Sequence, residues 1–172
     1  METGMRLRRR DVMTGAAALA VTASLPRAAS AAAAALLVSK RPPRGQRRFV
    51  SPAVEAEIAR VKAKIADPEL AWLFENCYPN TLDTTVKVGT VDGKPDAFVI
   101  TGDIEALWLR DSSAQMQAYV HLAPKDAGLR RVFTGLIARQ ARCILIDPYA
   151  NAFMEDPTAK SNLGARTDQT DM

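Results

Sequence analysis

The stretch TGDIEALWLRDSSAQ, residues 101–115, decides how this 172-residue chain is organised. Asp, Arg, Trp and Ser crowd into it, without the apolar spacing of an ordinary core segment. A second stretch of the same kind, DPYANAF at residues 147–153, follows a long segment with an apolar stripe. Carboxylate, guanidinium, amide and aromatic groups beside helices are typical of a pocket for a polar, uncharged ligand such as a sugar.

Helix start signals frame these two stretches. Ser51-Pro52 and Asp67-Pro68 each place a capping residue before a proline, and Pro124 with Asp126 opens the longest helix. The sequence therefore predicts helices from residues 51, 67 and 126, each with an apolar face. The first face carries Val54, Ile58, Val61 and Ile65, and the last carries Leu129, Val132, Phe133, Leu136, Ile137 and Ile144.

A further helix is expected after Arg110. Asp111 or Ser112 can cap it, and Ser112 with Gln115 matches a capping box. Gln140 shares the apolar stripe of the long helix, and a buried amide needs partners, so we expect it to bond between helices.

One segment has β-strand character. Residues 84–88 and 97–101 flank Asp92-Gly93, which is a hairpin turn signal. The segment between these two runs is longer than a two-residue loop, so the pattern predicts a hairpin with an extended connection.

The first 31 residues have the features of an export signal. Arg6, Arg8, Arg9 and Arg10 precede a short Ala-rich apolar run, and Ala29-Ser30-Ala31 fits a cleavage site. The run is shorter than the roughly 20 apolar residues of a membrane span. The paired arginines favour the twin-arginine route, with an ordinary secretory signal as the alternative. We expect a periplasmic or extracellular protein with no stable membrane anchor after signal cleavage.

Charge divides the chain at residue 49. Residues 1–31 hold five basic and two acidic residues, and residues 40–48 add five basic ones. We assign residues 32–48 to a flexible linker and residues 49–172 to the folded part, which holds 13 basic and 17 acidic residues. A nucleic-acid-binding domain keeps its positive charge on the folded part, so nucleic acid is excluded as a partner.

Metal-ligating side chains are sparse. The chain has two cysteines, Cys77 and Cys143, and one histidine, His121. This set gives no zinc-ligand cluster, and we expect neither a metal nor a cofactor. A disulfide between the two cysteines and a pair of buried thiols both remain open.

Three blocks closely resemble glycoside hydrolase family 125, the metal-independent exo-acting α-mannosidases. They are NTLDTTV (residues 80–86), ITGDIEALWLRDSSAQ (residues 100–115) and DPYANAF (residues 147–153). The resemblance implies an all-α fold, an incomplete (α/α)6 toroid of the six-hairpin type with a small inserted β-hairpin. It also implies a carbohydrate partner and exo-acting α-1,6-mannosidase activity by inversion, on α-mannosides or N-glycan-derived mannans.

The resemblance also locates a substrate site. It implies substrate-binding roles for Asp103, Trp108, Arg110, Asp111, Tyr149 and Asn151. From spacing alone, Arg110 and Asp111 instead form an ion pair that caps a helix, Trp108 lies in the core, and residues 147–153 form a helix-end turn. For Asn80 and Asp83, turn formation and pocket lining both remain open.

No residue of the chain is assigned a catalytic role. Inverting glycosidases use two carboxyl groups about 6.5–9.5 Å apart, and Asp103 and Asp111 are near each other in sequence. The resemblance places the acid and the base downstream of Met172, so we expect an inactive fragment. The alternatives are another six-hairpin glycosidase and a non-catalytic sugar-binding remnant.

Overall fold

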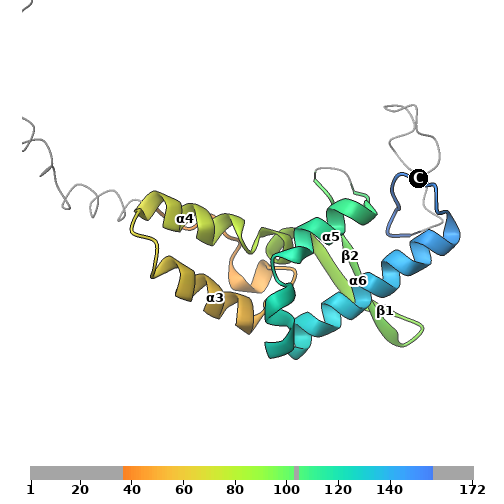
Figure 1. Cartoon of the computed structure of the whole chain (residues 1–172), viewed down its shortest axis with the longest axis horizontal. Coiled ribbons are helices and arrows are strands. Elements are labelled where there is room, and N and C mark those ends of the chain that lie inside the picture. Colours follow the sequence, from red (N-terminus) through yellow and green to blue (C-terminus); the bar gives the residue numbers. More distant parts are fainter. Residues whose placement is uncertain (1–36, 103–104, 157–172) are drawn as a thin grey trace, which may run out of the picture. The chain divides into compact units, whose positions relative to one another are not determined.

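The computed structural model describes residues 37–102 and 105–156, and from Val38 on they belong to one compact unit. The expected signal peptide, residues 1–31, lies outside the described residues, as does residue 103. The described part is mostly helical, with one two-stranded antiparallel sheet, as the sequence predicts (Figure 1).

Two helices begin at the predicted caps. In α3 (Pro52–Lys62) the Ser51 hydroxyl accepts a hydrogen bond from the Val54 amide at 3.2 Å. In α4 (Pro68–Cys77) the Asp67 carboxylate accepts from two amides of the first turn. The two helices pack as a pair, and Lys62 forms an ion pair with Glu75 between them. Both start signals are confirmed because capping is a local interaction.

The hairpin is tighter than predicted. After a short π-helical segment η3 (Thr81–Thr85), strand β1 (Val86–Val91) pairs with β2 (Lys94–Val99), and Val91 faces Lys94. Only Asp92 and Gly93 connect them, with φ angles of 51° and 74°. Two positive φ angles are what the tightest hairpin turns require. The prediction of an extended connection is therefore wrong, because pairing continues to the turn.

The hairpin belongs to the core. Helix α6 (Ala127–Ile146), capped by Asp126 as predicted, packs along β2 (Figure 1). Gly135 of α6 lies so close that a Cβ atom there would be 2.6 Å from the Asp96 carbonyl carbon. The residues buried at this interface and beneath it are Val86, Ala97, Phe98, Val99, Leu129, Val132 and Leu136. Strand and helix are thus held at backbone contact distance.

Helix α5 begins earlier than its sequence suggests. It spans Leu109–Gln117 with Trp108 as N-cap, and no side chain caps it. The capping box at Ser112 is wrong, because Ser112 is fully buried and its hydroxyl donates to the Leu109 carbonyl at 3.2 Å. A 3₁₀ segment, η4 (Val120–Lys125), joins α5 to α6. Burial against α6 overrides the local capping signal.

Residues 38–48 are part of the fold, which corrects their assignment to a flexible linker. The Arg41 guanidinium, with 6% of its side chain exposed, contacts Asp83 at 2.7 Å and Glu55 at 2.5 Å. Arg47 also contacts Glu55, at 3.2 Å. A buried carboxylate such as Asp83 is stable only when it is paired. The basic residues of this segment supply that partner.

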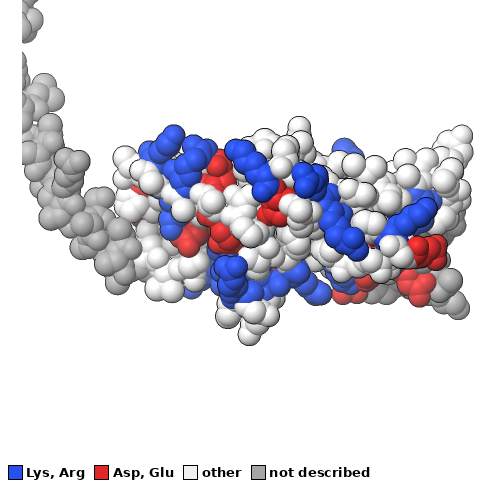
Figure 2. Space-filling view, turned by 90° about the horizontal axis from the view of Figure 1, so that it is seen from below, with Lys and Arg blue, Asp and Glu red and all other residues white. Residues whose placement is uncertain are grey.

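Charges of both signs are mixed on the surface. On the face shown in Figure 2, Lys and Arg side chains are interspersed with Asp and Glu. Among residues 37–102 and 105–156, no helix has the length and apolar character to cross a membrane. In the same ranges, no group of three or more His, Cys, Asp or Glu side chains is placed to hold a metal ion. Cys77 is exposed, Cys143 is buried, and the two are not paired.

Substitution of Gly135 tests the contact between α6 and β2. In Gly135→Ala the new methyl group meets the Asp96 carbonyl carbon at 2.6 Å and the Ala97 nitrogen at 2.7 Å, both of them backbone atoms. We expect a loss of about 1–3 kcal/mol in the free energy of unfolding, measured by urea denaturation. Gly89→Ala is the control, because no atom lies within 4 Å of its added methyl group. Equal effects at both positions would contradict the close approach.

Candidate functional site

An isolated antiparallel bridge joins the two polar stretches. The Leu107 amide donates to the Phe153 carbonyl at 2.8 Å, and the Phe153 amide donates back at 3.0 Å. Leu107 is fully buried, and Phe153 is 7% exposed. The bridge therefore joins two segments that are far apart in sequence.

Thr101 closes the loop that leads to the bridge. Its hydroxyl donates to the Ala106 carbonyl at 3.0 Å and accepts from the Trp108 amide at 3.4 Å. Gly102 adopts a φ of 73°, which lets the chain turn at this point. The predicted site residue Asp103 belongs to this loop but lies outside the described residues.

Trp108, Arg110 and Asp111 lie at the start of α5. Trp108 is half-buried. Arg110 and Asp111 form an ion pair at 3.1 Å, with side chains 87% and 38% exposed. The pair exists, as one interpretation of the sequence holds, but neither side chain caps the helix. An ion pair this exposed contributes little to stability, so both groups lie open to a ligand.

The second stretch forms a turn at the end of α6. The Asp147 carboxylate accepts from the Tyr149 amide at 2.8 Å, which starts the turn. Tyr149 is 94% exposed, and Asn151 is also exposed. Tyr149 thus presents a nearly complete aromatic face to solvent, the kind of surface on which a sugar ring stacks.

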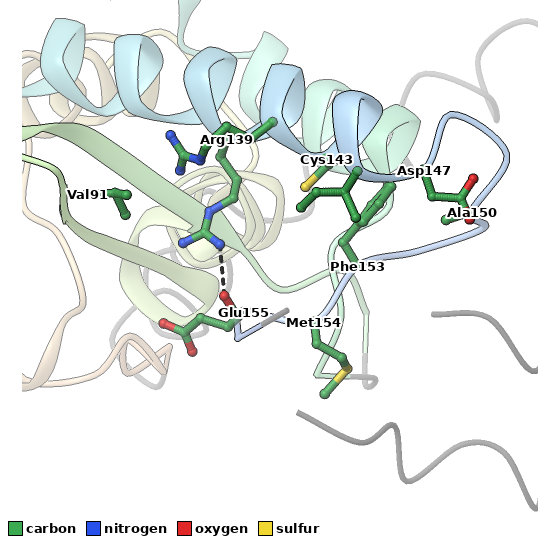
Figure 3. Close-up of a pocket in the computed structure, with 10 residues that line it drawn as sticks. Val91, Arg139, Cys143, Asp147, Ala150, Phe153, Met154 and Glu155 are labelled. Atoms are coloured by element: carbon green, nitrogen blue, oxygen red, sulfur yellow. Dashed lines mark hydrogen bonds between the residues drawn. The ribbon is translucent and has the colours of Figure 1, made fainter. Parts of the chain in front are cut away.

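Helix α6 contacts the chain that follows this turn. Asp96, with 9% of its side chain exposed, receives Arg139 through two contacts of 2.6 and 3.0 Å, and Arg142 also pairs with it. Arg139 also donates to the Glu155 carbonyl at 2.8 Å (Figure 3). Sequence reasoning missed Arg139, because only the fold brings an arginine of α6 to the chain after Phe153.

A cavity of about 490 Å³ lies under the turn. Its walls come from the end of α6 and from the chain beyond the turn, including Cys143, Ile146, Phe153 and Met154 (Figure 3). Burial raises the pKa of the Cys143 thiol, which keeps it protonated. Among the described residues, Tyr149 and Asn151 do not line this cavity. Trp108, Arg110 and Asp111 are not among its lining residues either.

In the third block, residues 80–86, Asp83 has a structural role. The Asp83 carboxylate is 3% exposed and pairs with Arg41, so it is not open to a ligand. Asn80 is exposed, and its carbonyl accepts from the Thr84 hydroxyl at 2.8 Å, which forms a local turn. Pocket lining is thus ruled out for Asp83 by its ion pair, and both alternatives remain open for the exposed Asn80.

Thr101 offers a test of how the loop is held. In Thr101→Val the shape is kept, but the Trp108 amide loses its acceptor, which costs about 1–3 kcal/mol in unfolding free energy. Faster hydrogen exchange of the Trp108 amide should accompany that loss. Thr101→Ser keeps the hydroxyl and is the control. If Val and Ser variants unfold at the same urea concentration, the hydroxyl does not hold the loop.

Comparisons with known proteins agree on one family. Residues 67–172 match the model of the metal-independent alpha-mannosidases, GH125. The meiotically up-regulated gene 157 protein of Schizosaccharomyces pombe is 46% identical over 115 residues, which are 66% of this chain and 23% of that protein. A solved structure from Streptococcus pneumoniae is 44% identical with a TM-score of 0.56, covering 63% of this chain and 25% of that one. It is described as a metal-independent alpha mannosidase in a non-productive complex with α-1,6-mannobiose. The chain thus spans about a quarter of the length of either relative.

Proposed function

The chain belongs to the metal-independent alpha-mannosidases of family GH125, and we propose that it supplies sugar-contacting segments of an exo-acting α-1,6-mannosidase that works by inversion. The bridge between Leu107 and Phe153 is the observation that carries this proposal. It joins the residue before Trp108, at the start of α5, to the last residue of the DPYANAF stretch, and both stretches carry exposed polar groups.

The exposed groups match the chemistry of a terminal mannose. A guanidinium offers several N–H donors, a carboxylate accepts from hydroxyl groups, and an amide does both. Arg110, Asp111 and Asn151 provide one of each, while Tyr149 and Trp108 provide aromatic surface. The α-1,6-mannobiose bound by the streptococcal relative supports an α-1,6-mannoside as the ligand here.

The proposal includes the (α/α)6 toroid. Helices α3 and α4 already pack as a pair, and α4 leaves Leu70 and Leu73 about half exposed, at 54% and 49%. In α6, Ile137 is 65% exposed. In a ring of helical hairpins such faces pack against neighbouring hairpins.

We also propose that this chain alone does not hydrolyse the glycosidic bond. A general acid needs a raised pKa at its carboxyl group. In the described residues, the carboxyl groups with a shifted pKa have a lowered one instead. The Arg41 hydrogen bond lowers the pKa of Glu55, and that of Glu57 falls because of Arg60. At Asp126, burial would raise the pKa, but hydrogen bonds from Ser51 and backbone amides outweigh it.

Export completes the proposal. The arginine-rich start, the short apolar run and Ala29-Ser30-Ala31 support a signal peptide of the twin-arginine type. An exported mannosidase would meet α-mannosides or N-glycan-derived mannans outside the cytoplasm.

A chimera tests the activity. Residues 67–172 replace the matching segment of the streptococcal enzyme, and the product is assayed on α-1,6-mannobiose by NMR. We expect mannose release that a chelator does not reduce, with β-mannose appearing first because the mechanism inverts. The unmodified 172-residue chain should release no mannose. Release of α-mannose first would contradict inversion, and dependence on an added divalent metal would contradict the family mechanism.

Site variants in the chimera test the two exposed charges. Arg110→Ala and Asp111→Ala should each cost about 2–4 kcal/mol in kcat/KM, because sugar hydroxyl groups lose charge-assisted partners. Arg131→Ala is the matched control, since Arg131 is an exposed arginine on α6. If all three variants keep the parent kcat/KM, the Arg110–Asp111 pair is structural and the proposed site is wrong.

A further inference from the structure

Gln140 of α6 forms hydrogen bonds with the first turn of α5. Its side-chain amide donates to the Ser112 hydroxyl at 2.9 Å, the Ser113 hydroxyl at 3.0 Å and the Leu109 carbonyl at 3.2 Å. Residues three and four apart share one face of a helix. Leu109, Ser112 and Ser113 therefore form the face toward α6, and Arg110 lies at the edge of that face with its side chain 87% exposed.

This turn needs an external support. No side chain caps α5, which is nine residues long. A short helix without a cap frays at its first turn. The Ser112 and Ser113 hydroxyl groups also donate to the Leu109 carbonyl, at 3.2 and 2.8 Å. Gln140 thus joins a small hydrogen-bond network that centres on one carbonyl of the turn.

Gln140 is held in place because the preceding residue in the sequence, Arg139, is itself fixed. Arg139 is fixed by two contacts to the buried Asp96 carboxylate, and it donates to the Glu155 carbonyl. Two consecutive residues of α6 therefore contact the start of α5 and the chain just after the second polar stretch. Arg139 holds the chain after Phe153, and Gln140 holds the start of α5.

We infer that Gln140 is a positioning residue that sets the orientation of Arg110 and Asp111 toward the sugar. This inference rests on the proposed function of these two residues. Gln140 acts through the first turn of α5, so its removal changes sugar affinity less once Arg110 is absent and only Asp111 is left to be positioned.

A double-mutant cycle on the 172-residue chain tests this coupling. Gln140→Met keeps the side-chain length and removes the donor, and α-1,6-mannobiose affinity is measured by calorimetry with and without Arg110→Ala. We expect Gln140→Met to weaken binding about five-fold alone and less than about two-fold beside Arg110→Ala. Equal weakening in both backgrounds, or none in either, would overturn the inference. Gln117→Met, an exposed glutamine on α5, is the control and should leave affinity unchanged.

Two further measurements separate the role of Gln140 from the proposed sugar binding. Ser113→Ala removes one acceptor at an exposed position, so it should fold and weaken binding in the same direction by a smaller factor. Hydrogen exchange needs no sugar: Gln140→Met should speed exchange of the amides of residues 112–114 and leave the amides of residues 132–136 in α6 unchanged. If the wild-type chain alone binds no mannobiose, the chimera decides the proposed function, and hydrogen exchange decides whether Gln140 holds the turn. Unchanged exchange would then overturn the positioning role.

Discussion

The buried carboxylate of Asp96 fixes helix α6 on strand β2. It lies on β2 with 9% of its side chain exposed, and Arg139 and Arg142 reach it from α6. Removal of both arginines would leave an uncompensated buried charge, which costs roughly 3–5 kcal/mol. The helix is therefore fixed on the hairpin in one register, and Gly135 allows their backbones to touch. Both polar segments are then attached to α6, through Arg139 and Gln140.

A second buried carboxylate explains why the basic segment is ordered. Asp83 pairs with Arg41 from the segment before α3. Residues 49–172 carry a net charge of about −4, from 13 basic and 17 acidic residues. Part of that negative charge is thus neutralised by the preceding segment. The compact unit begins at Val38 instead of residue 49, and Arg41 and Arg47 tie this segment to Glu55 and Asp83.

Local signals in the sequence were sufficient for three of the helices. Ser51, Asp67 and Asp126 each bond to amides within their own first turn, so the start of each helix could be predicted. Ser112 carries the same kind of signal and misleads, because burial against α6 extends the helix before it. The order of residues 38–48 could not be predicted, since ion pairs between distant residues leave no periodic pattern.

The sequence was sufficient to predict the two segments of the candidate site but not the bridge that joins them. The resemblance identified both polar segments, and the exposure of Arg110 and Tyr149 agrees with a contact role. Their meeting through Leu107 and Phe153 depends on two backbone hydrogen bonds, which any pair of residues can make. Only the folded chain shows that the two segments are joined by a backbone bridge.

An NMR titration with α-1,6-mannobiose tests that surface most directly. On ¹⁵N-labelled chain, amide shifts should change together in residues 107–113 and 149–153, with one dissociation constant for both groups. The amides near Asp83 and Arg41 should not change, because those side chains are buried in ion pairs. Shifts in only one of the two segments would contradict a single sugar-binding surface.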